Sequence, residues 1–343
     1  MELSERKRAI IAEIVRFHIE SGEPIGSKIL AERLPNAPST ATLRNEMNEL
    51  CQMGYLSQPH TSAGRIPTSK AYRLYVTELM QHETLSEEGK LVLDKMLETL
   101  TPDPENIGAS AATILSELTG LPVLALSNVG QNVKIKKVSL LPMGRSSAVI
   151  FLITDDGRAR SRLVCIDSPL SDNIVNKFNE IVGERICGQD ATTLDAAYLQ
   201  STVVLAGLDA LSIAPLLSGV FSLAGELRES DVKMVGTENL FSLFRTEAHA
   251  RRMLELLQGN DTVTSIIGAV TDPVGVVFGD DTAFSELEPA GMIVASFGDE
   301  RQYGKIALIG PTRMSYGKLL PSVEYLAGRV GNIMSNVLKG LEE

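Results

Sequence analysis

The sequence contains no tryptophan, only three cysteines and only four histidines among its 343 residues. Cys51, Cys165 and Cys187 have no metal-like spacing, and the dispersed histidines offer zinc no recognisable ligand set. Because the cysteine count is odd and the N-terminus carries no signal peptide, we expect reduced, mostly buried thiols in a cytoplasmic protein. A disulfide-stapled secreted domain is therefore excluded.

Catalytic motifs are also missing. The sequence has no Walker loop, no Gly-x-Ser-x-Gly elbow and no His-Glu-x-x-His helix. One group of carboxylates would suit a metal ion, but an acidic loop is the better interpretation; it comprises Asp280, Asp281, Glu286 and Glu288. We therefore expect a protein that is not an enzyme and that carries no cofactor and no metal.

Long uninterrupted hydrophobic runs are absent as well. The most apolar tract, 203–221, is broken by Asp209 and Pro215, so its runs are shorter than the roughly 20 residues that a membrane span needs. We expect no membrane span but a buried core or a subunit interface. The predicted dimerisation residues are Leu205, Leu208, Leu211, Leu216, Leu217, Val220 and Phe221.

Acidic residues are missing from 50–77, although the whole chain has a net charge of −11. Residues 1–80 hold ten Lys and Arg against nine Asp and Glu, a net charge of +1, which leaves −12 for the remainder. The acid-free stretch carries Arg65, Lys70 and Arg73. This charge asymmetry suggests two functions in one chain and directs attention to the N-terminus as a DNA-binding region.

Apolar residues at helical spacing predict helices over 4–20 and 27–34, and a third from 39 to 53 that Ser39 caps and Gly54 stops. The third helix turns Leu43, Met47 and Leu50 inward. Its outer face then carries side chains that can bind base edges and phosphates at short reach. The predicted recognition residues are Ser39, Thr40, Thr42, Arg44, Asn45 and Asn48.

The next segment predicts a hairpin, with short strands at 55–59 and 65–67 around a tip at 60–64. A helix follows from 68 or 69, with Tyr72 and Tyr75 expected in the core. A polar helix followed by a basic hairpin is typical of a winged helix-turn-helix. The predicted DNA contacts of the wing and the helix after it are His60, Thr61, Ser62, Arg65, Lys70 and Arg73.

Three segments, GEPIGSK at 22–28, STATLRNEM at 39–47 and PHTSAGRIPT at 59–68, resemble the HrcA family of bacterial heat-inducible transcription repressors. The resemblance implies a homodimer that binds double-stranded DNA at an inverted-repeat operator upstream of chaperone genes. It also implies the GroE chaperonin as a partner that keeps the repressor active. During heat stress, unfolded proteins would occupy the chaperonin, and the repressor would be released from its operator.

The remaining chain mixes helices and strands. Helices are predicted over 85–100, 107–118, 247–257 and 316–338, strands at 134–141, 148–154, 159–166, 232–235, 274–278, 292–297 and 305–309, and mostly helix over 171–230. The expected fold is an α+β multidomain chain: a winged helix at 1–82, a connecting helix and linker at 83–104, and an α/β domain at 105–170 and 231–343 that the resemblance implies to be GAF-like. The resemblance implies that a helical/β dimerisation domain is inserted, at about 171–230.

An alternative function is a small-molecule-sensing transcription regulator of GAF type, in which the body binds a metabolite and the N-terminal module follows. A rise in melting temperature with ligand would favour this alternative. Protection of chaperone-operon DNA in footprinting would favour the heat-shock repressor.

Overall fold

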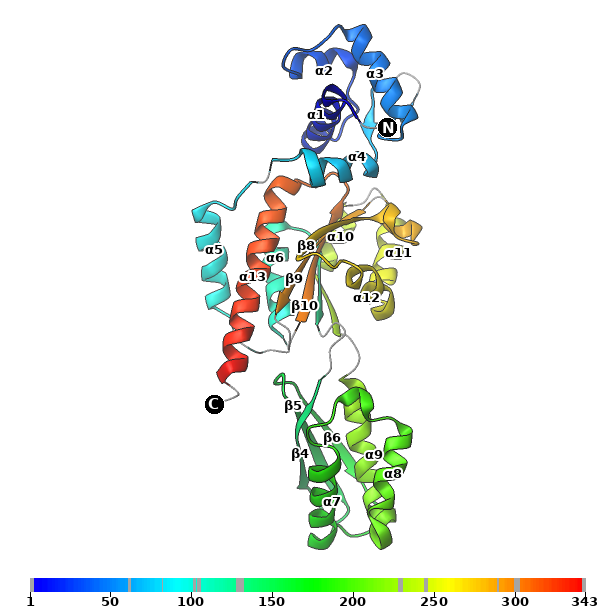
Figure 1. Cartoon of the computed structure of the whole chain (residues 1–343), viewed down its shortest axis with the longest axis vertical. Helices are drawn as coiled ribbons and strands as arrows, with labels where there is room; N and C mark the ends of the chain where they lie inside the picture. Colours follow the sequence, from blue (N-terminus) through cyan, green and yellow to red (C-terminus); the bar gives the residue numbers. More distant parts are fainter. Residues whose placement is uncertain are drawn as a thin grey trace.

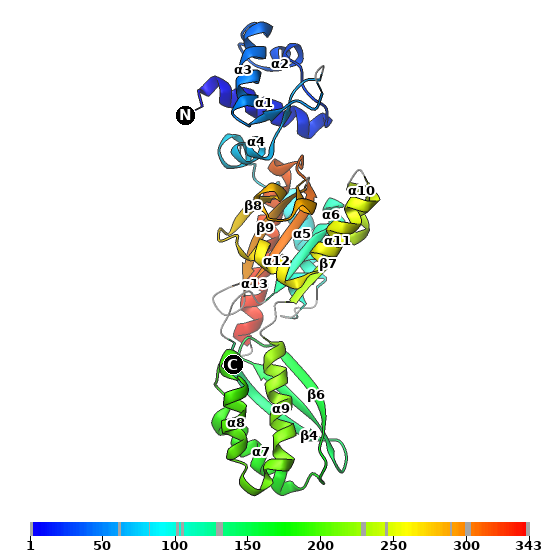
Figure 2. The same ribbon diagram turned by 90° about the vertical axis from the view of Figure 1, so that its right-hand side faces the viewer.

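A computed structural model describes residues 3–60, 63–81, 83–100, 103, 106–127, 133–227, 231–243, 246–288, 290–298 and 303–340. Three parts follow one another along the long axis of the molecule (Figures 1 and 2). The N-terminal helices lie at one end, a five-stranded sheet with its helices lies in the middle, and a second α/β unit lies at the far end.

The N-terminal part follows its local sequence signals. It comprises α1 (Glu5–Ser21), α2 (Ser27–Arg33), α3 (Thr40–Gln52), β1 (Leu56–Ser57), β2 (Ile66–Pro67), α4 (Ser69–Leu74) and the π-helical turn η1 (Tyr75–Leu79). The Ser39 side chain accepts a hydrogen bond from the Thr42 amide and caps α3, as expected. Tyr72 and Tyr75 are buried, which confirms their predicted place in the core.

The wing is held by backbone pairing. Strands β1 and β2 are antiparallel, and Arg65 forms a further antiparallel bridge with Ile25 through hydrogen bonds of 2.9 and 3.0 Å. The chain approaches so closely here that a β-carbon at Gly64 would lie 2.4 Å from the Ile25 carbonyl carbon and oxygen. Only glycine fits this position, so Gly64 sets how near the wing lies to the body of the domain.

The central domain is built on an antiparallel sheet in the order β7-β3-β10-β9-β8. Its strands are β3 (Val123–Ser127), β7 (Asp231–Val235), β8 (Val274–Phe278), β9 (Ala290–Gly298) and β10 (Tyr303–Pro311). Helices α5 (Glu87–Glu98), α6 (Ile107–Thr119) and α13 (Tyr316–Gly340) lie on one side, and α10 (Thr237–Leu243), α11 (Glu247–Leu257) and α12 (Asn260–Gly268) on the other (Figure 1). The layers are consistent with the expected GAF-like fold.

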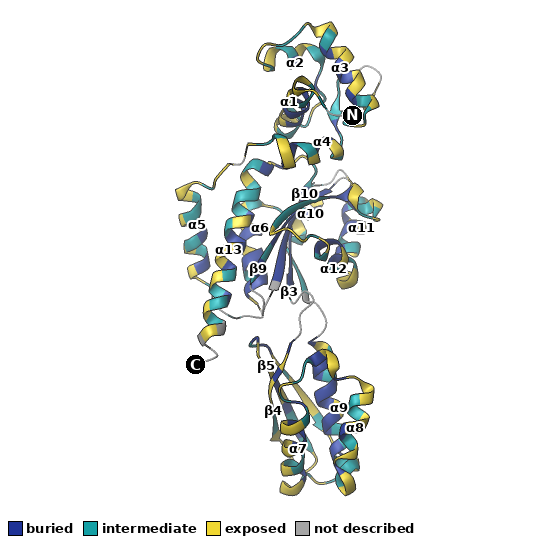
Figure 3. Ribbon diagram, in the orientation of Figure 1, coloured by how far each residue is buried: buried dark blue, intermediate teal, exposed yellow. Residues whose placement is uncertain are grey.

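Alternate residues of this sheet supply two different cores. On β3, Val123 and Ala125 pack with α6 and α13, whereas Leu124 and Leu126 pack with α11 and α12. The sheet is therefore buried on both faces, as Figure 3 shows. Strand β3 pairs with β7 and β10 inside the sheet, although the sequence pattern predicted no strand there.

The inserted unit begins earlier than predicted. Strands β4 (Ile135–Pro142), β5 (Ser147–Thr154) and β6 (Ala159–Cys165) do not join the central sheet but form their own antiparallel sheet. They share one core with α7 (Asp172–Arg185), α8 (Ala196–Val204) and α9 (Ala210–Glu226). The insert therefore spans about 133–227, and the expected start at 171 is wrong because it separates this sheet from the helices that cover it.

Helix α9 and the turn before it, Gly207–Glu226, are long and apolar enough to cross a membrane by length and composition. Their apolar side chains fill the core of the insert instead, since Ile213, Leu216 and Leu217 are fully buried against its sheet. The expectation of mostly buried cysteines is wrong, because Cys165 is exposed and Cys51 and Cys187 are only partly buried.

Candidate nucleic-acid interface

The outer face of α3 carries the predicted recognition residues. Ser39, Thr40, Arg44, Asn45 and Asn48 are exposed, and Thr42 is partly buried because its hydroxyl lies 2.9 Å from Ser39 Oγ at the cap. Leu43, Met47 and Leu50 are buried on the opposite side. The helix therefore presents one polar face with a single cation, Arg44, and two amides.

The two acids of α3 point away from this face. Glu46 is buried and pairs with Arg6 of α1, and the Glu49 carboxylate lies 2.7 Å from Lys7 Nζ. Both carboxylates are thus neutralised by cations of the first helix. The recognition face keeps its positive charge without a neighbouring acid, which is what approach to a phosphate backbone requires.

The wing and α3 are joined by a direct side-chain contact. Arg65 Nη2 donates a hydrogen bond of 2.6 Å to Asn48 Oδ1. A hollow of about 460 Å³ lies between α2, α3 and the wing, and both residues line it together with Arg44. Arg65 was predicted to contact phosphate, and in the structure it also fixes the position of a recognition residue.

Two residues that the sequence did not single out line the same hollow. Ser27 opens α2, and Gln58 spans the wing by donating a 3.1 Å hydrogen bond to the Ala63 carbonyl. Ser27 lies within the GEPIGSK segment and Gln58 within the first predicted wing strand, but neither carries a charge, and only the fold brings them to the interface. Of the remaining predicted wing residues, His60 is exposed at the tip, while Thr61 and Ser62 lie outside the described residues.

Lys70 is exposed but has a local structural contact. Its ammonium donates a 3.0 Å hydrogen bond to the Met53 carbonyl and lies 4.3 Å from the centre of the Tyr55 ring. It therefore stabilises the C-terminal end of α3 next to the wing.

Arg73 contacts the central domain. Its guanidinium forms an ion pair with Asp281 of the central domain and lies 5.7 Å from the centre of the Phe278 ring. Tyr72 beside it packs against Phe278 and Tyr316, with ring centroids 6.4 and 6.2 Å apart. These contacts dock this face of α4 onto the body, so Arg73 has a structural role at the domain contact, and its DNA contact stays a prediction.

The predicted dimerisation residues divide into two groups. Leu216, Leu217, Val220 and Phe221 are buried in the core of the insert, so they have no surface to offer a second copy and their prediction is wrong. Leu205, Leu208 and Leu211 are exposed at the corner between α8 and α9. Among the four carboxylates at 280–288, Asp281 serves the ion pair with Arg73.

Two family models cover most of the chain. Residues 2–81 match the winged helix-turn-helix transcription repressor model, HrcA DNA-binding, and residues 105–320 match the model of the HrcA protein C-terminal domain. The first match ends within two residues of the N-terminal part described above and contains the whole α3–wing surface.

Similar curated proteins extend over the full length. The chain is 32% identical to the heat-inducible transcription repressor HrcA of Clostridium perfringens (strain ATCC 13124), with 99% of this chain and 98% of that protein covered. It is 28% identical to the protein of the same name from Acetivibrio thermocellus, with 96% of each covered. A solved structure described as a hypothetical protein aligns at a TM-score of 0.59 and 25% identity over 98% of this chain and 99% of its own. The chain belongs to the HrcA family of heat-inducible transcription repressors and is a DNA-binding regulator rather than an enzyme.

Proposed function

We propose that this repressor binds an inverted-repeat operator upstream of chaperone genes as a homodimer in the cytoplasm. The observation that carries the proposal is the shared surface of α3 and the wing, where Arg44, Asn45 and Asn48 lie together and the acids of α3 face away. In a two-fold dimer, two such surfaces match the symmetry of an inverted repeat.

Exposed apolar side chains of the insert support the dimer. One face of its sheet packs on α7 and α9, and side chains at alternate positions point to the other face. The exposed large apolar residues of that outer face are Leu141, Phe151, Ile153 and Leu163. With Leu205, Leu208 and Leu211 at the α8–α9 corner, they give the insert two groups of exposed apolar side chains that a second copy would cover in a dimer.

Two substitutions that introduce a charge test the dimer. Leu163→Asp examines the outer sheet face and Leu211→Asp the helical corner, at positions that are 62% and 92% exposed and tolerate a polar residue in a monomer. Sedimentation should show a monomer for the variant whose face makes the contact. Two variants that both stay dimeric would remove the insert's exposed surface from the interface.

We further propose that the GroE chaperonin maintains the active repressor and that heat stress, by occupying the chaperonin, opens the chaperone operons. Footprinting on the upstream DNA of chaperone operons, at two temperatures and with or without chaperonin, tests both parts. Protection at the lower temperature that is restored at the higher one by chaperonin is the expected result. Absence of protection under every condition would exclude the operator, and protection unaffected by chaperonin would exclude the partner.

A further inference from the structure

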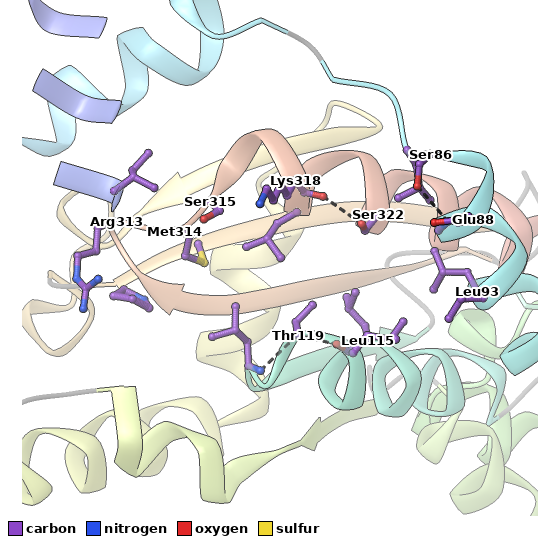
Figure 4. Close-up of a pocket in the computed structure, with 18 of the residues that line it drawn as sticks. Ser86, Glu88, Leu93, Leu115, Thr119, Arg313, Met314, Ser315, Lys318 and Ser322 are labelled. Carbon is purple, nitrogen blue, oxygen red and sulfur yellow. Dashed lines mark hydrogen bonds between the residues drawn. The ribbon is translucent and has the colours of Figure 1, made fainter. Parts of the chain in front are cut away.

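A pocket of about 770 Å³ lies in the central domain, at the side that faces the N-terminal domain (Figure 4). Helices α5, α6 and α13 form its walls, and Ile19 of α1 reaches it from the N-terminal domain. Its floor is apolar, since Leu93, Leu115 and Met314 are 2%, 0% and 4% exposed. A groove with an apolar floor and a few converging polar groups is the usual form of a small-molecule site.

The charges of this pocket are separated along its length. Figure 4 shows Arg313 and Ser315 toward one end, Ser86 and Glu88 at the other, and Lys318 between the two ends. Among the described residues, neither Arg313 nor Lys318 has a side-chain ion pair or hydrogen bond. Two cations without a side-chain partner among the described residues, one at an end of an apolar groove and one between its ends, form a local site for a negatively charged group in a chain of net charge −11.

We infer that this pocket binds a small amphipathic anion, whose carboxylate or phosphate head contacts Arg313 and Lys318 while its apolar chain lies over Leu93, Leu115 and Met314. The length of the groove between its two polar ends favours an elongated body over a compact inorganic ion. Among the described residues that line the pocket, the single acid is Glu88, which lies at the end away from Arg313.

Binding here would affect the DNA-binding domain. Arg313 lies against the end of α1, where a β-carbon at Gly22 would be 3.6 Å from its Cζ atom. Helix α5 begins just after the segment that leaves the N-terminal domain, and Ser86, its N-cap, also lines the pocket. A ligand would therefore contact two of the connections between the two domains, and ligand and operator would change each other's affinity by the same factor. The coupling between ligand and operator rests on the proposed function, whereas the binding of the anion does not.

Calorimetric titration of the full chain with decanoate and with decyl phosphate, below their micellar concentrations, tests the site. Decanol and decylamine have the same chain length without the negative charge. We expect saturable binding of one or both anions at one site per chain, and at least tenfold weaker binding of the alcohol and the amine. Absence of saturable binding by either anion, or equal binding of decanol, would overturn the inference.

Variants locate the binding. Arg313→Ala with Lys318→Ala should weaken anion binding at least tenfold, and Val92→Trp, at a 46% exposed position of the lining, should block the groove. Arg251→Ala with Lys177→Ala removes the same charge from one exposed and one half-buried site away from the pocket and should leave anion binding unchanged. Equal loss of anion binding in both double variants would mean that the overall charge of the protein, and not this pocket, determines the binding. If the anion binds at this site but operator affinity is unchanged, the regulatory part is wrong, whereas failure of operator binding without ligand concerns only the proposed function.

Discussion

Arg73 of α4 forms an ion pair with Asp281, which lies 208 positions further along the chain in the turn after β8. Asp281 is itself held in place by the Phe278 amide, which donates a 3.2 Å hydrogen bond to Oδ2. The pair lies beside the packed rings of Tyr72, Phe278 and Tyr316. The contact between the N-terminal DNA-binding domain and the central domain is therefore an apolar cluster with an ion pair at its edge.

The ion pair of Arg73 with Asp281 leads to a prediction about how operator affinity depends on salt concentration. Each phosphate contact adds about 0.9 to the slope of log affinity against log salt concentration. Because Arg73 faces Asp281, Arg73→Ala should leave the slope of operator binding unchanged, whereas Arg44→Ala should reduce it if Arg44 reaches a phosphate. Fluorescence anisotropy at four salt concentrations measures both slopes. A slope reduced by about one unit in Arg73→Ala would return this residue to the DNA surface.

The outer face of α3 leads to a second prediction. If Arg44 and Asn45 each make a good base contact, Arg44→Ala or Asn45→Ala should cost about 1–3 kcal/mol of operator binding and relax the base preference. Arg16→Ala is a suitable control, because Arg16 is also exposed on a helix of this domain but pairs with Glu13. Competition binding against operators with single base changes measures the effect. Unchanged operator affinity in the double variant Arg44→Ala/Asn45→Ala would remove α3 from recognition.

A third prediction concerns pH. Burial lowers the pKa of His18 below its ordinary value of 6.5, and the Arg313 charge lowers it further, while Glu23 opposes the shift. The unfolded chain therefore binds this proton more readily than the folded one, so stability is intact above about pH 6.5 and falls as the pH drops toward the lower folded pKa. The ring nitrogen Nδ1 of His18 lies 2.6 Å from the Tyr72 hydroxyl. Protonation of His18 therefore places a positive charge at the edge of the domain contact.

Denaturant unfolding between pH 5 and 8 checks this linkage. His18→Gln keeps a polar atom for Tyr72 but does not titrate, and it should flatten part of the fall in unfolding free energy below pH 6.5. His60→Gln replaces an exposed histidine at the tip of the wing and serves as the control. Identical pH profiles for wild type and His18→Gln would show that His18 does not carry the dependence.

The sequence predicted the winged helix because its signals are local. Ser39 caps α3, Gly54 follows it with a positive φ of 78°, and the buried triplet Leu43, Met47 and Leu50 repeats at helical spacing. The contact of Arg73 with the central domain was not predicted, for the opposite reason. Its spacing from Lys70 suggested a shared basic face, but its orientation depends on a partner from the far end of the chain.

The body was harder to predict because its strands are defined by long-range pairing. Strand β3 is buried on both faces, so Val123 to Leu126 lack the alternation that marks a half-buried strand. Strands β4 to β6 were recognised as strands, yet no local pattern shows which sheet they join. The apolar tract around α9 likewise gave no sign that Leu216 and Leu217 face inward while Leu208 and Leu211 face solvent.

The fourth prediction concerns the insert, which contains a buried ion pair between Arg158 and Asp156. Arg158 Nε donates a 2.8 Å hydrogen bond to Asp156 Oδ2, and its Nη1 donates one of 3.1 Å to the Leu227 carbonyl just after α9. The pair therefore joins the turn between β5 and β6 to the end of the last helix of the insert. Arg158 and Asp156 are 1% and 3% exposed, so neither charge is solvated if its partner is removed.

Arg158→Met should destabilise the insert by about 3–5 kcal/mol, because it leaves the Asp156 carboxylate buried without its cation. The double variant Arg158→Met/Asp156→Asn removes both charges and should recover part of this loss. Since the insert has a core of its own, hydrogen exchange should show the loss in β4–β6 and α9 and leave β9 and β10 protected as before. Uniform loss of protection across both sheets would mean that the insert and the central domain unfold as one unit.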